Sequence, residues 1–185
     1  MPRRIIEFDP PDRFLAGALG APEQRTFFLQ ASRGREVVSV ALEKVQVAAL
    51  AERLAALLAE LQRRGLDVPV EAGVPPRDPA PLHEPVVELF RAGTLTLAWD
   101  GAGHRIVIEA REATEGDEAD EADEISDDAS EGPDLVRVRI TLSDALAFAE
   151  GAAQVVAAGR PPCPLCGLPL NPEGHICPRR NGYVH

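Results

Sequence analysis

The sequence has no long apolar run and only three cysteines among its 185 residues. Its longest uniformly apolar stretches, such as 54–59, are far shorter than the about 20 residues that a membrane-spanning helix needs. Residues 1–9 contain no apolar stretch of the kind that marks a secretory signal. An odd number of cysteines also argues against a disulfide framework. Together these absences predict a cytoplasmic protein that does not contact a membrane.

Sequence signatures of several enzyme classes are missing as well. No phosphate-binding loop or dinucleotide fingerprint occurs, because the glycines of 101–103 fit a hairpin turn rather than a strand-to-helix turn. Ser39 and Ser143 lack the glycines of a nucleophile elbow. Neither His83 nor His104 has an acid nearby at catalytic spacing. The sequence therefore favours a protein that is not an enzyme.

Positive charge is scarce, and the imbalance has one source. The chain carries 30 acidic and 19 basic residues, for a formal net charge of −11. Ten of the acidic residues lie between Thr114 and Pro133, a segment with no basic residue, so the rest of the chain is close to neutral. Because Ile125 is its single large apolar residue, this segment cannot bury enough surface to offset its ordering entropy. We therefore predict a disordered acidic loop over 114–133.

Two functional alternatives for the acidic loop are attraction of a basic partner and cation binding. Calcium is disfavoured, because the D-x-[DN]-x-[DN]-G loop with its closing glutamate does not occur.

Hydrophobic periodicity predicts one α+β domain over residues 1–158. Alternating or short apolar runs between turn residues predict seven strands, at 3–8, 13–19, 25–32, 36–43, 94–99, 105–110 and 135–142. A helical period predicts helices at 45–64 and 144–158, the first ending at Gly65 and the second capped by Ser143. The expected architecture is a largely antiparallel sheet of about seven strands with two helices on one face.

Two details of this organisation are specific enough to check. The second helix should face the core with an apolar stripe of Leu146, Ala149, Ala153 and Val156. Six prolines between Pro69 and Pro85 exclude a helix or a central strand there, so 67–85 should be an extended connection along the domain surface.

All three cysteines lie near the C-terminus, in a predicted zinc-binding tail over 159–185. Cys163 and Cys166 form a Cys-x-x-Cys pair, and His175 and Cys177 form a second, tighter pair. Three thiolates and one imidazole make a closed tetrahedral set, which is the chemistry of structural Zn²⁺. Such a site would supply the folding energy that so short a tail lacks.

Other arrangements of this tail stay open. His185 could replace His175 as the fourth ligand, or a water could take that place and leave a catalytic zinc. A redox Cys-x-x-Cys normally opens a helix in a thioredoxin-like unit, a context that this proline-rich tail lacks. Buried thiols with no joint role are the remaining alternative.

The tail pattern is specific enough to carry a resemblance. Its motif CPLCGxPLxPxGHxCPRxNGY, over 163–183, occurs together with the opening segment 4–14, RIIEFDPPDRF. The two resemble an actinobacterial family of uncharacterised proteins, known only as a conserved domain of unknown function, and the similarity runs nearly end to end. The resemblance implies a cytoplasmic bacterial protein with the zinc tail as a family feature, and it implies no activity.

These observations favour a non-enzymatic zinc-binding adaptor or regulatory protein that contacts another protein. Arg179, Arg180, Asn181 and Tyr183 follow the metal ligands and form a candidate recognition patch. Two alternatives remain: an enzyme with a site in the sheet or at an open zinc, and a nucleic-acid-binding protein that uses the arginine-rich tail.

Overall fold

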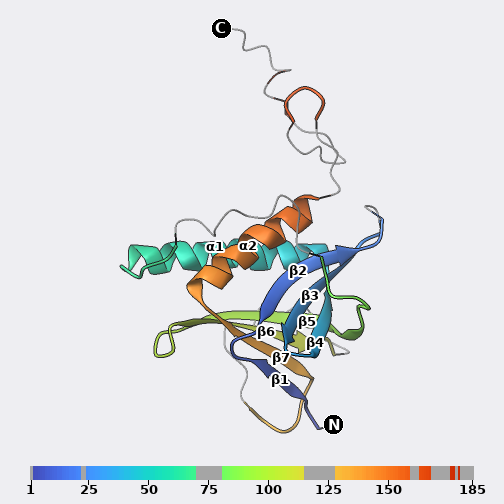
Figure 1. The fold of residues 1–185 in the computed structure, drawn as a ribbon, viewed down its shortest axis with the longest axis vertical. Coiled ribbons are helices and arrows are strands. Elements are labelled where there is room, and N and C mark those ends of the chain that lie inside the picture. The colour runs from blue at the N-terminus through green and yellow to red at the C-terminus, as the bar shows by residue number, and fades with distance from the viewer. Residues whose placement is uncertain are drawn as a thin grey trace.

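The computed structural model describes residues 2–21, 24–69, 81–114, 128–158, 163–167, 176, 177 and 179. Figure 1 shows the elements in these ranges, which follow the order β1 (Ile5–Phe8), β2 (Arg13–Leu19), β3 (Thr26–Arg33), β4 (Glu36–Leu42), α1 (Lys44–Arg63), β5 (Glu88–Asp100), β6 (Arg105–Glu112), β7 (Leu135–Ile140) and α2 (Leu142–Ala157). Within the described part of the chain, neither helix is long and apolar enough to cross a membrane.

The strands form one mixed sheet in the order β1-β7-β6-β5-β4-β3-β2. Four of its pairings are antiparallel, and the other two, β1 with β7 and β4 with β5, are parallel. The expected α+β fold, a largely antiparallel seven-stranded sheet with two helices, is confirmed. Each half of the chain has three antiparallel strands that lead into a helix, and α1 is the crossover that makes β4 and β5 parallel.

The sheet is strongly curled because its two edges are joined by a short link. β1 and β2 are the edge strands, yet only residues 9–12 connect them. Such a link spans at most roughly 17 Å, whereas the edges of a flat seven-stranded sheet would lie roughly 29 Å apart. β1 accordingly contacts β3 across the open side of the sheet. The curl gives the sheet a concave face, which becomes the core.

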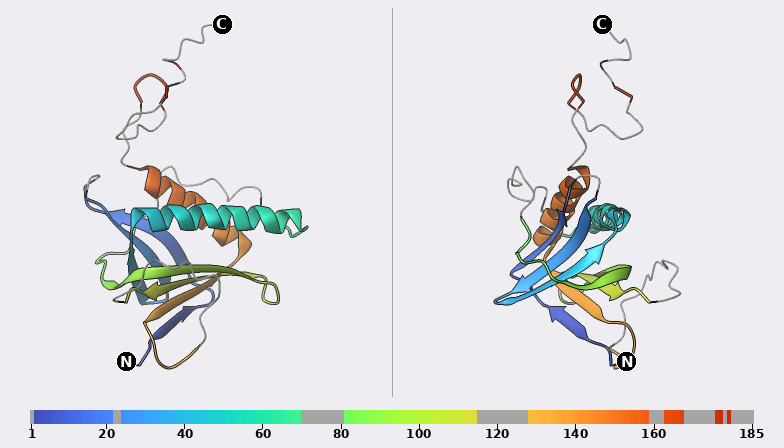
Figure 2. Two further views of the ribbon diagram at one scale, coloured as in Figure 1. Left: turned by 180° about the vertical axis from the view of Figure 1, so that it is seen from behind. Right: turned by 90° about the vertical axis from the view of Figure 1, so that its right-hand side faces the viewer.

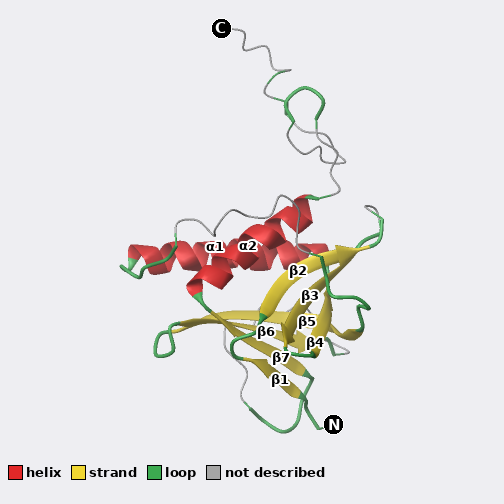
Figure 3. Cartoon of the chain, viewed as in Figure 1, coloured by secondary structure: helices red, strands yellow, loops and turns green. Residues whose placement is uncertain are grey.

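Both helices pack on that concave face, as Figures 2 and 3 show. The core combines alternate residues of the strands with one side of each helix: Phe27, Leu29, Ala31, Val38, Val40, Leu42, Ile106, Ile108, Ala110, Val136, Val138 and Ile140 from the sheet, and Val47, Leu50, Leu54, Leu58 and Leu61 from α1. α2 is joined to β2 by Phe148, whose ring stacks on that of Phe14 with centroids 4.5 Å apart. The expectation of two helices on one face of the sheet is therefore met.

The structure corrects the prediction for α2 in two ways. Its N-cap is Thr141, whose side chain accepts a hydrogen bond from the Asp144 backbone N–H, so the assignment to Ser143 was wrong. Its core-facing residues are Ala145, Phe148, Ala149, Ala152 and Val155. The predicted stripe shares only Ala149 with this set, because α2 is apolar on two sides and periodicity alone cannot say which side faces the sheet.

The end of α1 agrees with the sequence. Gly65 follows the last turn with φ of +87°, a conformation that glycine adopts without strain, and its N–H donates to the Gln62 carbonyl oxygen. α2 ends differently, since the Arg25 side chain donates a hydrogen bond to the Ala158 carbonyl oxygen at 2.6 Å.

Part of the proline-rich connection lies on the outer face of the sheet, as its prolines predict. Gln30 is buried there, and its side-chain amide donates to the Ser39 hydroxyl at 3.0 Å and to the His83 carbonyl oxygen at 3.2 Å. The His83 N–H donates back to the Gln30 side-chain oxygen at 2.7 Å. Leu82 packs so closely on Gly17 that a methyl group at position 17 would overlap it. Residues 70–80 of the predicted connection lie outside the described residues.

The acidic segment is described only at its two ends. Residues 115–127 lie outside the described residues, so the predicted disorder stays a prediction. At the C-terminal end, the Asp128 carboxylate pairs with Arg137 at 2.9 Å, and the Ser130 carbonyl oxygen accepts a hydrogen bond from the Arg3 N–H at 2.9 Å. The last residues of the segment, just before β7, are therefore held to the body by these contacts.

Candidate metal centre

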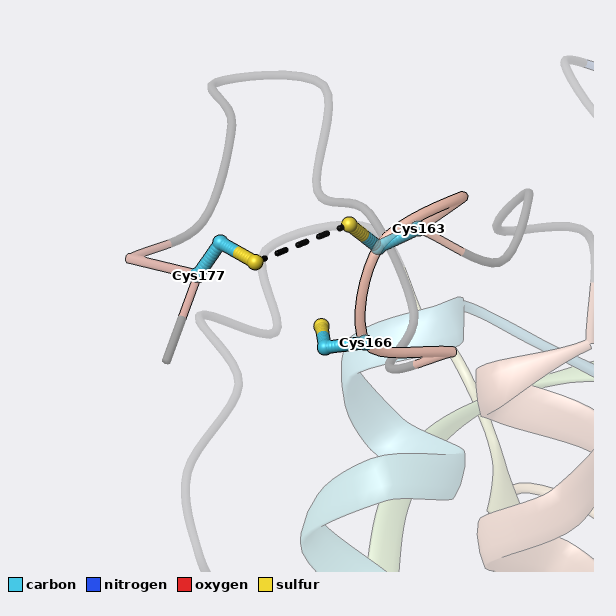
Figure 4. Close-up of side chains that lie close together, drawn as sticks. All are labelled: Cys163, Cys166 and Cys177. Carbon is cyan, nitrogen blue, oxygen red and sulfur yellow. Dashed lines mark hydrogen bonds between the residues drawn. The ribbon is translucent and has the colours of Figure 1, made fainter. Parts of the chain in front are cut away.

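The Cys-x-x-Cys pair lies in a tight turn. The Gly167 N–H donates to the Cys163 carbonyl oxygen at 2.8 Å, which closes the loop of residues 163–167. Gly167 has φ of +74°, the left-handed region that favours glycine. The turn brings Cys163 and Cys166 to the same side of the chain, as Figure 4 shows.

The third cysteine comes from a second arm of the chain. The sulfur atoms of Cys163, Cys166 and Cys177 all lie within 4.8 Å of one another, and those of Cys163 and Cys177 are 3.9 Å apart (Figure 4). Cys163 and Cys177 are buried and Cys166 is half-buried. A disulfide needs a sulfur–sulfur distance near 2.05 Å, and these three cysteines are close together without forming one.

Hydrogen bonds favour the thiolate form of Cys163. The backbone N–H groups of Cys166 and Leu165 point at its sulfur and lower the pKa of the thiol below its ordinary value, and the Cys166 and Cys177 side chains add to the effect. Burial opposes the shift without cancelling it. Because the thiolate is the form that binds metals, this shift is compatible with metal binding at Cys163.

The spacing of the sulfur atoms fits a tetrahedral metal ion. Zn²⁺ bound by thiolates has Zn–S bonds of about 2.3 Å, which places neighbouring sulfurs about 3.8 Å apart. The Cys163–Cys177 separation of 3.9 Å is close to that edge. A redox Cys-x-x-Cys pair needs only two sulfur atoms, whereas this cluster has three. The cluster therefore fits a bound metal better than a redox pair.

The structure places only part of the predicted site. It brings together Cys163, Cys166 and Cys177, whereas His175 and His185, the two candidates for the fourth ligand, lie outside the described residues. In the candidate recognition patch, Arg179 is described and exposed. The other three residues of the patch, Arg180, Asn181 and Tyr183, also lie outside the described residues.

The histidines and the serine that the sequence analysis weighed as catalytic candidates make contacts typical of structural residues. His83 is held through its backbone by Gln30, and Ser39 accepts a hydrogen bond from the same side chain. His104 lies in the β5–β6 hairpin, where its ring meets Trp99 edge-on with centroids 5.9 Å apart. None of these contacts joins a nucleophile to a base among the residues that the structure describes.

One buried polar group was missed by the sequence interpretation. Glu109 on β6 and Arg137 on β7 form an ion pair of 2.6 Å on the outer face of the sheet. The only signal in the sequence was a charged residue at alternate positions of two strands, which ordinarily marks a solvent-facing side. Both side chains are almost completely buried, which indicates a structural role for the pair.

Comparisons with known proteins give a family and no activity. A family model described as "Protein of unknown function (DUF3090)" matches residues 6–177, which covers both the α+β body and the three cysteines. No curated protein and no solved structure matches the chain.

Proposed function

The chain belongs to the DUF3090 family, and from its own residues we propose that it binds one structural Zn²⁺ ion through Cys163, Cys166 and Cys177. The observation that supports this proposal is the convergence of three cysteine sulfurs within 4.8 Å of one another, from two segments of the chain, with no disulfide among them. The lowered pKa of Cys163 favours the same role. His175 completes the site, because it precedes Cys177 by two residues and an imidazole is a common partner of three thiolates.

The metal proposal is tested on the full chain purified under reducing conditions. Elemental analysis should give one zinc per chain, and X-ray absorption should show three sulfur ligands and one nitrogen ligand. His175→Ala should remove the nitrogen ligand, whereas His185→Ala is the matched control and should leave the spectrum unchanged. A protein without zinc, or with a loss on His185→Ala alone, contradicts the assignment.

The same measurement separates a structural from a catalytic zinc. A closed site with four protein ligands leaves no position for water, so it cannot generate a metal-bound nucleophile. Three sulfur ligands with one oxygen at water distance would favour the enzyme alternative, and would redirect the search to hydrolytic activity.

The function that such a site serves best is that of an adaptor. A closed zinc site organises a short chain segment without performing chemistry, and it leaves apolar and basic side chains next to the metal. Leu165 and Ile176 are exposed neighbours of Cys166 and Cys177, and Arg179 is exposed two residues further on. Arginine is enriched at protein interfaces, and exposed apolar side chains beside it add apolar area that a partner can bury.

The adaptor proposal is tested by chemical crosslinking of the zinc-loaded chain in lysate of its host, followed by mass spectrometry. One protein should be captured in a stoichiometric amount by the wild type and lost with Cys166→Ser, whose body should remain folded because the core contains none of the cysteines. Capture that Cys166→Ser does not change contradicts a role for the zinc tail. Retention of DNA or RNA that is lost with Arg179→Ala/Arg180→Ala would favour the nucleic-acid alternative instead.

A further inference from the structure

An apolar groove runs between α1 and α2 on the side away from the sheet. It has a volume of about 380 Å³, and its lining is Ala48, Ala51, Glu52 and Ala55 of α1 with Leu146, Ala149, Glu150, Ala153, Val156 and Ala157 of α2. The predicted apolar stripe of α2 lines this groove; Ala149 also belongs to the core, and Leu146 and Val156 pack against the core while partly buried. A helix that is apolar on two sides ordinarily has a partner on both, and the described residues supply one for the core side alone.

The charged residues of the groove indicate which kind of ligand it can bind. Glu52 and Glu150 stand on opposite walls and are the charged residues of the lining. α2 contains no basic residue, and Arg53 and Arg63 of α1 are not part of the lining. A ligand that combines apolar side chains with a positive charge therefore complements the groove.

The chain's own zinc tail carries this chemistry. Leu165 is 50% exposed and Ile176 is 83% exposed, so both apolar side chains are open to solvent. Arg179 is exposed as well, and residues 159–185 carry three arginines and one glutamate. Leu165 and Ile176 come from the two arms that the three cysteines join, so a bound metal would present them together.

The tether between the tail and the groove is short enough for docking within one chain. Figures 1 and 2 show the turn of residues 163–167 beyond the C-terminal end of α2. Cys163 follows Ala158, the cap of α2, after only four residues, which allows a span of roughly 17 Å. The part of α2 that lines the groove, 146–157, is also about 17 Å long. A tether of this length gives an effective concentration on the order of millimolar.

We propose that the zinc-loaded tail, through Leu165, Ile176 and Arg179, docks into the α1–α2 groove of its own chain. This inference rests on the proposed zinc site, because the metal joins the two arms that carry the apolar side chains. Docking covers the surface with which the tail would contact another protein. The tail stays bound in the groove until a partner with the same apolar and basic chemistry takes its place, which exposes that surface of the tail.

The test is site-specific photo-crosslinking in the full-length, zinc-loaded protein. The photoreactive residue p-benzoylphenylalanine replaces Ala153, which lines the groove. Val45, an exposed residue of α1 outside the groove, is the control position. We expect a crosslink from position 153 to the tail peptides that contain residues 163–179, and a yield at least fivefold lower from position 45.

Variants show whether the contact has the proposed chemistry. Leu165→Asp/Ile176→Asp changes only the tail, leaves the body intact and should remove most of the crosslink. Glu52→Arg/Glu150→Arg should reduce it at least fivefold, and Arg179→Glu in that background should restore part of it. A crosslink that survives both double variants overturns the proposal.

Two further controls identify the occupant. When isotopically labelled and unlabelled chains are mixed, crosslinks should join peptides of the same chain, and crosslinks between chains alone would overturn docking in cis in favour of a second copy. Zinc content is measured on the same sample. A chain that holds zinc and gives no crosslink at position 153 overturns this inference while the zinc site stands, whereas a chain that holds no zinc overturns the zinc site itself.

Discussion

Arg137 donates a hydrogen bond of 2.6 Å to Glu109 on the neighbouring strand, and only 5% and 1% of the two side chains are exposed. The two residues are opposite each other in the β6–β7 register, so the strand pairing itself brings the charges together. Arg137 also pairs with the exposed carboxylate of Asp128 at 2.9 Å. Burial acts to lower the pKa of Arg137, but the bonds to both carboxylates outweigh it and hold that pKa above its ordinary value.

Removing one partner of this buried pair should be costly. Glu109→Gln leaves the Arg137 guanidinium enclosed with reduced compensation, and we expect the free energy of unfolding to fall by about 3 to 5 kcal/mol. Asp128→Asn should cost at most about 1 kcal/mol, because that carboxylate is exposed to solvent. Urea denaturation followed by circular dichroism measures both changes.

A double replacement shows whether the ion pair between Glu109 and Arg137 stabilises the protein by more than the cost of burying its two charges. Glu109→Leu/Arg137→Met removes both charges and keeps side chains of similar length, so it should cost less than Glu109→Gln alone. If the double variant is the less stable of the two, the ion pair contributes more than the desolvation that it requires, which contradicts this expectation.

Local features of the fold were predictable because they depend on short-range patterns. Apolar residues at helical spacing indicated α1 and its end at Gly65, and alternation indicated the β3–β4 and β5–β6 hairpins. β5 was predicted to begin at residue 94, but it begins at Glu88. The reason is a bulge between Ala92 and Thr94, where Gly93 interrupts the alternation. The first part of β5 pairs with β4 in parallel, and no pattern within β5 indicates that neighbour.

Long-range features were not predictable from one sequence. The parallel pairing of β1 with β7 joins Ile5 to Leu135, and neither strand carries a local signal for the other. Arg137 pairs with Glu109 on β6 and with Asp128 before β7, and the alternation of arginines with apolar residues in β7 gives no sign of either partner. The cysteine cluster was predictable because Cys-x-x-Cys spacing has a geometric meaning in itself. The fourth ligand, His175 or its alternative His185, stays a prediction because both residues lie outside the described ones.

Acid should weaken the contact that holds the N-terminal edge of the sheet. Asp134 accepts hydrogen bonds from the Arg4 backbone N–H at 2.8 Å and from its side chain at 2.6 Å. Burial acts to raise the pKa of Asp134, but the bonds and the charge of Arg4 together outweigh it and lower that pKa. A lowered pKa in the folded state stabilises the protein above the unfolded-state value of about 3.9, and this contribution is lost as the pH falls through the folded-state pKa.

Asp134→Asn should therefore cost about 1 kcal/mol or more at pH 7, and the difference from wild type should shrink as the pH falls below about 3.9. Urea midpoints at a series of pH values measure this. Glu36→Gln, which removes a carboxylate from an exposed position of the β3–β4 hairpin, is the control for a general effect of charge. An equal cost of Asp134→Asn at pH 7 and pH 2 would show that the bond does not depend on ionisation.

The stacked rings of Phe14 and Phe148 should make the largest apolar contribution to the docking of α2. Phe148 is buried, and its ring lies nearly parallel to that of Phe14, with an interplanar angle of 14°. Phe148→Ala removes this ring from the core and should lower the free energy of unfolding by about 3 to 5 kcal/mol. Phe148→Leu retains most of the volume and should cost less than half as much. Equal costs for the two variants would mean that the volume retained by leucine does not replace the ring, which contradicts this expectation.

Loss of the metal should leave the α+β body intact. The core contains residues of the strands and both helices and none of the three cysteines, so the body should stay folded without zinc and lose only the contact of the docked tail with the α1–α2 groove. Cys166→Ser should abolish zinc binding and leave a cooperative urea transition of the body, with a midpoint lowered by no more than Leu165→Asp/Ile176→Asp lowers it. Chelation of the wild-type protein should do the same, with hydrogen exchange faster only in the tail and in the helical segments that line the groove. Unfolding of the body on chelation that Cys166→Ser reproduces would contradict the boundary near residue 158, because it would show that the tail and body unfold as one cooperative unit.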